Sequence, residues 1–120
     1  MQNLDQIRAR NALAFAARPL TGQNQGDVIK NLPHQVLNHG LLAVMAFGFA
    51  DNQQAVGRVF DAIAQHLADK DIGIVDANCM DRTKLMDFLT RKETTSGTLK
   101  LATAEAMAWL AFAKRFVKKD

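Results

Sequence analysis

The C-terminal stretch from about Thr98 to Lys118 constrains the fold of this chain more than any other segment. Its apolar side chains recur in steps of three and four residues, at Leu99, Ala102, Ala106, Trp109, Ala113 and Phe116. That spacing places them on one side of an α-helix, so a long helix that packs along its whole length is predicted. Other elements must cover that apolar side, which favours a helical bundle.

Three further stretches have the composition and spacing of shorter helices. The pattern indicates helices over about residues 4–17, 51–68 and 81–91. Each of them follows a residue suited to capping a helix N-terminus, namely Asn3, Asp51 and Asp81. The intervening residues 69–80 contain a brief IGIV run, but a lone strand has no partner, so this segment is expected to be a loop.

The region between the first two of these helices combines a proline with an apolar run. A helix is expected to begin near Asp27 and to break or kink at Pro33, because proline lacks the backbone donor that a helix interior needs. Residues 34–39 then form a separate segment that ends at Gly40, a residue suited to a left-handed cap. Residues 41–50 are apolar on nearly every side and are expected to form the core.

Length and composition fit one helical unit in the cytoplasm. The 120 residues include 48% hydrophobic and 22% charged side chains, a balance typical of globular rather than disordered chains. We predict an all-α, compact single-domain bundle of about five to seven helices over residues 1–120. The apolar run at 41–50 is too short to span a bilayer, no signal-peptide pattern is present, and one cysteine, Cys79, cannot form an internal disulfide.

No group of residues has the spacing of a known catalytic, metal or cofactor site. The three histidines lack metal-ligand spacing, and the glycines are scattered singly rather than gathered in a phosphate-binding loop. We therefore expect no catalytic residues, no metal and no cofactor, with neither a membrane nor a small-molecule substrate as partner. The alternative from a different class of function is a small enzyme that uses His66, Cys79 or Asp76.

Charge is distributed unevenly along the chain. The net charge is +2 over residues 1–50, −3 over residues 51–90 and +4 over residues 91–120. Basic ends around an acidic middle suit an anionic polymer, or contact between the acidic part of one copy and the basic part of another. The candidate residues for contact with the phosphate backbone of a nucleic acid are Arg8, Arg10, Lys30, Lys114, Arg115, Lys118 and Lys119. The last four of these residues, near the C-terminus, have an alternative role: they can balance the negative end of the dipole of the last helix without any ligand.

Three segments carry a family resemblance, namely LDQIRARNALAFA from residue 4, VIKNLPHQVLNHGLLAVMAFGFA from residue 28 and ATAEAMAWLAFAKRF from residue 102. Together they resemble the small helical subunit of the type III-B CRISPR effector, the Cmr complex. The matching positions are Lys30, Pro33, Gly40, Leu41, Leu42, Ala46 and Phe47 in the second segment and Ala102, Thr103, Glu105, Phe112, Lys114, Arg115 and Phe116 in the third. Phe112 stands where the family usually has Trp, and a common Tyr is replaced near Ser96.

The resemblance implies a non-catalytic subunit of a ribonucleoprotein that acts in antiviral defence. Such subunits are present in several copies, which stack side by side as the minor filament along the guide RNA (crRNA) and the target RNA. Their partners are other Cmr subunits, copies of themselves and RNA, whose phosphates their basic surface contacts. A helical protein–protein adaptor without nucleic-acid binding is the alternative that the residues leave open.

Overall fold

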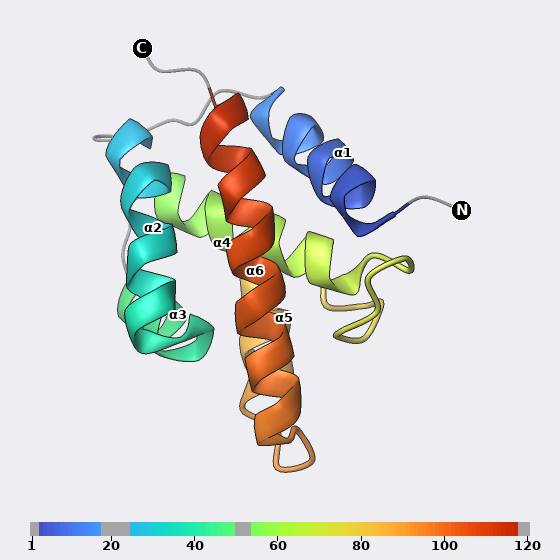
Figure 1. Cartoon of the computed structure of the whole chain (residues 1–120). Helices are drawn as coiled ribbons and strands as arrows, with labels where there is room; N and C mark the ends of the chain where they lie inside the picture. Colours follow the sequence, from blue (N-terminus) through green and yellow to red (C-terminus); the bar gives the residue numbers. More distant parts are fainter. Residues whose placement is uncertain (1–2, 18–24, 50–53, 118–120) are drawn as a thin grey trace.

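Six helices form the part of the chain that this computed structural model describes, residues 3–17, 25–49 and 54–117. They are α1 (Leu4–Ala16), α2 (Gln25–His39), α3 (Leu41–Phe49), α4 (Gln54–Ala68), α5 (Arg82–Leu89) and α6 (Ser96–Phe116). No strand occurs in these ranges, so the all-α prediction is confirmed. The long helix α6 runs through the molecule, with α1 on one side, α2 and α3 on the other, and α4 crossing behind it (Figure 1).

The helix N-termini are capped as the sequence predicts. Asn3 Oδ1 accepts a hydrogen bond from the Gln6 backbone N–H at 2.9 Å, and the Gln6 side chain accepts one from the Asn3 N–H in return. Asp81 caps α5 through the Lys84 N–H at 2.8 Å. The cap of α6 is Thr95, so this helix begins slightly before the predicted start. The predicted cap at Asp51 lies outside the described residues.

Helix α2 continues through Pro33, so the expected division into two segments at that residue is wrong. The proline removes one backbone hydrogen bond, but Ile29, Leu32 and Val36 keep the buried side of the helix continuous on both sides of it. Packing against α6 therefore holds the helix together across the proline. Gly40 ends the helix with φ +83°, as predicted, and donates its N–H to Val36 O at 2.8 Å.

The centre of the core lies where α4 crosses α6. Phe60 and Ile63 of α4 and Trp109 and Leu110 of α6 are almost fully buried, which confirms the predicted apolar side of the last helix. The expectation that residues 41–50 form the core is confirmed in part. Leu41, Val44 and Met45 are buried core residues and Leu42 packs against them, whereas Ala46 is exposed. The side chains of residues 47–50 lie outside the part that the structure describes.

Residues 69–80 form turns without a strand, as predicted. The backbone N–H groups of Ile74 and Val75 both donate to Leu67 O, at 3.2 and 3.3 Å, which folds the segment back onto the end of α4. Gly73, with φ +64°, permits this reversal. Val75 and Cys79 are buried, so the loop contributes to the core.

Candidate functional site

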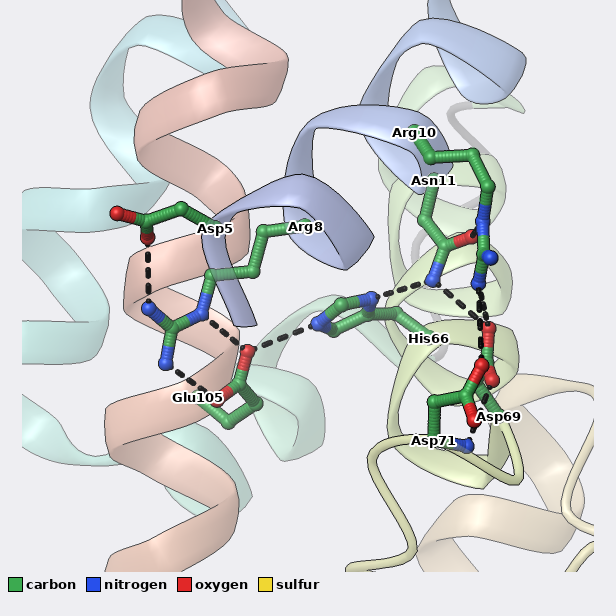
Figure 2. Close-up of polar contacts among 8 residues, drawn as sticks. All are labelled: Asp5, Arg8, Arg10, Asn11, His66, Asp69, Asp71 and Glu105. Carbon is green, nitrogen blue, oxygen red and sulfur yellow. Dashed lines mark hydrogen bonds and ion pairs between the residues drawn. The ribbon is translucent and has the colours of Figure 1, made fainter. Parts of the chain in front are cut away.

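A network of charged and polar side chains joins α1 to α4 and α6 (Figure 2). It comprises Arg8, Arg10, Asn11, His66, Asp69 and Glu105, and is called the α1 network below. Arg8 donates through Nε to Glu105 Oε2 at 2.7 Å and through Nη2 to Oε1 at 2.8 Å, a bidentate pair. The Glu105 side chain is 8% exposed and that of Arg8 is 20% exposed, so the pair is largely shielded from water.

His66 connects this ion pair to a second carboxylate. Its Nδ1 lies 2.9 Å from Asn11 Nδ2, and its Nε2 lies 2.9 Å from Glu105 Oε2. The Asn11 amide nitrogen can only donate, so Nδ1 accepts and Nε2 carries the proton that is donated to Glu105. These contacts describe a neutral imidazole. Asn11 also donates to Asp69 Oδ2 at 3.1 Å, which extends the network to the end of α4.

The pKa values within the network are shifted by burial and by these contacts. Burial lowers the pKa of His66, although Glu105 acts in the opposite direction. Burial alone would raise the pKa of Glu105, but hydrogen bonds from Arg8 and His66 outweigh it and the pKa is lowered. The pKa of Asp69 is lowered in the same way, since the hydrogen bonds from the Asp71 backbone and from Asn11 and the charge of Arg10 outweigh burial.

Both arginine candidates of α1 are held by carboxylates. Arg8 is paired with Glu105 and also donates to Asp5 at 3.0 Å. Arg10 donates to Asp69 at 2.8 Å, and its side chain is 45% exposed. The network therefore gives these two residues a structural role, which is to fasten α1 to the rest of the bundle.

The other described candidates are free of such partners. Lys30, Lys114 and Arg115 are exposed and form no hydrogen bond or ion pair with the part of the chain that the structure describes. Helix α2 begins and α6 ends at the same end of the molecule (Figure 1). Lys118 and Lys119 lie outside the described residues.

Sequence reasoning missed two groups of side chains. The first is the acidic and histidine half of the α1 network, whose only signal was one acidic residue, Glu105, among the apolar positions of the last helix. The second is a set of exposed lysines that lack ion pairs within the described ranges, namely Lys70, Lys84, Lys92 and Lys100. Single lysines spread along a chain give no pattern that distinguishes them from ordinary solvated charges.

Searches of the described residues for two other kinds of site gave no candidates. No three His, Cys, Asp or Glu side chains of residues 3–17, 25–49 and 54–117 lie close enough together to hold a metal ion. None of the six helices combines the length and the apolar character that crossing a bilayer requires.

Comparison with known proteins gives one family. A family model described as CRISPR-associated protein (Cas_Cmr5) matches residues 4–119. Comparison with curated proteins and with solved structures gives no significant match. The matched range includes all six described helices and the α1 network, so it extends well beyond the three segments that carry the resemblance.

Proposed function

The chain belongs to the CRISPR-associated Cmr5 family, and from that membership we propose that it is a non-catalytic small subunit of a type III-B RNA-guided effector complex. In this proposal several copies stack as the minor filament of the Cmr complex in the cytoplasm, and exposed basic side chains contact the backbones of guide and target RNA. The observation that carries the proposal is the family match over residues 4–119.

The distribution of unpaired charge supports RNA contact at one end of the molecule. Lys114 and Arg115 occupy the last turn of α6, are exposed and have no carboxylate partner among the described residues. Such side chains can approach a phosphate without first breaking an ion pair. They would supply sequence-independent, salt-sensitive binding. We assign the first phosphate contacts to these two residues and Lys30, with Lys118 and Lys119 as the next candidates along the chain.

The arginines of α1 have a secondary place in the proposal. Arg8 uses three of its nitrogen atoms on Glu105 and Asp5, so few donors remain for a phosphate. The Arg10 side chain is 45% exposed and that of Arg8 is 20% exposed. Because it is more accessible, Arg10 rather than Arg8 would carry any RNA contact made by α1.

One observation favours the alternative of a protein–protein adaptor. Lys114 and Arg115 lie in the last turn of α6, where cations stabilise the negative end of a helix dipole without any ligand. In addition, Leu37 and Leu101 are large apolar side chains that are 65% and 60% exposed, which suits contact with another protein. The adaptor would join the same assembly without binding RNA itself.

Affinity purification of the tagged chain from a cell that encodes a type III-B system tests the proposal. The expected result is co-elution with the large Cmr subunits and with a guide RNA that survives ribonuclease treatment inside the particle. Elution of the chain alone, without protein or RNA partners, would contradict it.

A second measurement separates the subunit that binds RNA from the adaptor. The affinity of the purified chain for single-stranded RNA is compared at about 50 and 200 mM salt. A phosphate binder loses affinity steeply over this range because counterions are released on binding. Binding that is absent or unaffected by salt favours the adaptor.

A further inference from the structure

A cleft of about 410 Å³ lies between α1 and α4, beside the α1 network. Ala14 of α1 and Ala62 of α4 are among its lining residues, and their small side chains leave the space between the two helices open. The volume is within the range of about 300–1,000 Å³ that is typical of small-ligand sites. None of the roles described above uses this space.

One side of α4 supplies the polar lining. Arg58, Asp61 and Gln65 follow one another at intervals of three and four residues and thus share a side of the helix. The Arg58 guanidinium lies over the Phe15 ring, with its central carbon 4.9 Å from the ring centroid, and it donates through Nη2 to Phe15 O at 2.9 Å. One face of this planar cation therefore lies on the Phe15 ring, so a ligand in the cleft can stack only on the opposite face.

Two hydrogen-bonding groups in the cleft are only partly used. Asp61 Oδ1 accepts the Arg82 backbone N–H at 2.9 Å, whereas Oδ2 has no partner in the described part of the chain. The Gln65 side-chain amide likewise has none there. The cleft thus offers a planar cationic face, a carboxylate that accepts, and an amide that both donates and accepts.

These groups select the chemistry of the ligand. The charges of Arg58 and Asp61 cancel. A phosphate in the cleft would be repelled by the Asp61 carboxylate, and a cation would be repelled by the Arg58 guanidinium. A flat, uncharged ring with adjacent N–H donors suits all three groups, because guanidinium planes stack on bases and carboxylates accept from base N–H groups. We propose that the cleft binds a guanine base stacked on Arg58, with its N1–H and N2–H donated to Asp61 and its O6 facing the Gln65 amide.

The other bases fit the same groups less well. Adenine and cytosine each place a ring acceptor beside the amino donor, and that lone pair would face the Asp61 carboxylate. Uracil has a single N–H between two carbonyls. Guanine alone presents two adjacent donors and a neighbouring acceptor. The inference depends on the proposed function only for the source of the base, which would be an unpaired nucleotide of an RNA strand.

NMR titration of the isotope-labelled chain tests the site. The probes are guanosine, adenosine and uridine 5′-monophosphates, and the reporters are the Gln65 side-chain amide and the backbone amides of α4. Saturable shifts are expected with the guanosine nucleotide, at an affinity about tenfold or more above that for the other two. Absence of saturable shifts at millimolar nucleotide, or equal affinity for all three, would overturn the proposal.

Two substitutions locate the binding. Asp61→Asn keeps an Oδ1 acceptor for the Arg82 N–H but places a donor against the guanine donors, so the preference for guanine is expected to disappear. Ala14→Leu narrows the cleft from an exposed position and is expected to weaken guanine binding by about tenfold or more. The matched control is Ala111→Leu, which adds the same side chain at an exposed position of α6 and keeps wild-type affinity. Unchanged guanine binding in both cleft variants would refute the site.

The source of the base is determined with two short RNAs, a uridine pentamer and the same pentamer with one central guanosine. Tighter binding of the guanosine pentamer than of the free nucleotide supports an RNA strand as the source. Equal affinity assigns the cleft to free guanine nucleotides. Because these titrations use the isolated chain, a guanine site that persists in a chain failing to co-purify with Cmr subunits would count against the proposed function alone.

Discussion

Helix α6 meets two of its neighbours, α4 and α1, in physically different ways. At the centre of the crossing with α4, Phe60, Ile63 and Leu110 are fully buried and form an apolar contact, while His66, near the end of α4, makes a polar contact with α6 through Glu105. At the contact with α1, the buried apolar side chains of Ile7 and Phe15 are supplemented by the α1 network, in which ionised groups lie against one another out of water.

This difference separates what holds the bundle together from what fixes the position of α1. Apolar burial is non-directional and roughly proportional to area, so the apolar centre of the α4–α6 crossing, at Phe60, Ile63 and Leu110, depends on volume and tolerates changes of pH. The α1 contact depends on geometry and protonation, because a charge left without its partner inside the protein is costly. We therefore expect the two regions to respond to different perturbations.

The largest effect is expected at the apolar crossing. Phe60→Ala removes a fully buried ring and leaves a cavity, and should lower the free energy of unfolding by about 3–5 kcal/mol. Urea denaturation followed by circular dichroism measures it. Leu37→Ala is the control, because its side chain is 65% exposed and its loss should change stability by about 0.5 kcal/mol or less. A similar loss in both variants would remove the distinction between core and surface.

A smaller effect is expected when the α1 network loses its central charge. Breaking a buried ion pair costs about 3–5 kcal/mol of stability. Glu105→Gln should lower the free energy of unfolding by about 2–3 kcal/mol, less than that range, because Arg8 keeps some exposure to water. The double variant Arg8→Met/Glu105→Gln should recover most of that loss, since neither charge is left behind and the Gln oxygen can still accept from His66. If the double variant is less stable than Glu105→Gln, the pair contributes net stability and the comparison must be revised.

The smallest effect is a pH dependence that only the α1 contact should show. The folded pKa of His66 lies below its ordinary value of 6.5, so below pH 6.5 the unfolded chain binds a proton that the folded chain resists. Stability should therefore fall as the pH falls from 6.5 towards the folded pKa, by at most about 1.4 kcal/mol per pH unit. The lowered pKa values of Glu105 and Asp69 extend the loss to more acidic pH.

Denaturant titrations between pH 7.5 and 5 measure this slope. His66→Gln should flatten it, whereas His39→Gln, which replaces an exposed side chain, should leave it unchanged. An unaltered slope in His66→Gln would mean that the imidazole does not couple folding to protons.

The two regions also differ in how far the sequence predicts them. The apolar side of α6, the caps at Asn3 and Asp81 and the left-handed Gly40 follow from local spacing and residue chemistry, and all are confirmed. The contact between Arg8 and Glu105 joins residues 97 positions apart, and no local pattern encodes it.

Tertiary packing also explains why two local rules failed. The rule that proline interrupts a helix did not hold at Pro33, because the packing of α2 against α6 outweighed one lost hydrogen bond. The apolar character of residues 41–50 did not show that α3 has an exposed side at Ala46. The cleft could not be predicted either, since two helices distant in the sequence line it, with Ala14 on α1 and Ala62 on α4.

Whether the basic end of α6 contacts RNA is decided by the salt dependence of RNA affinity in two matched double variants. Each double variant removes two exposed positive charges, Lys114→Ala/Arg115→Ala from the end of α6 and Lys70→Ala/Lys84→Ala from elsewhere. The α6 variant should bind single-stranded RNA more weakly, with a log–log salt slope reduced in magnitude by about 1.4 for two lost contacts. The control should retain the wild-type slope; identical slopes for all three proteins would contradict the claim.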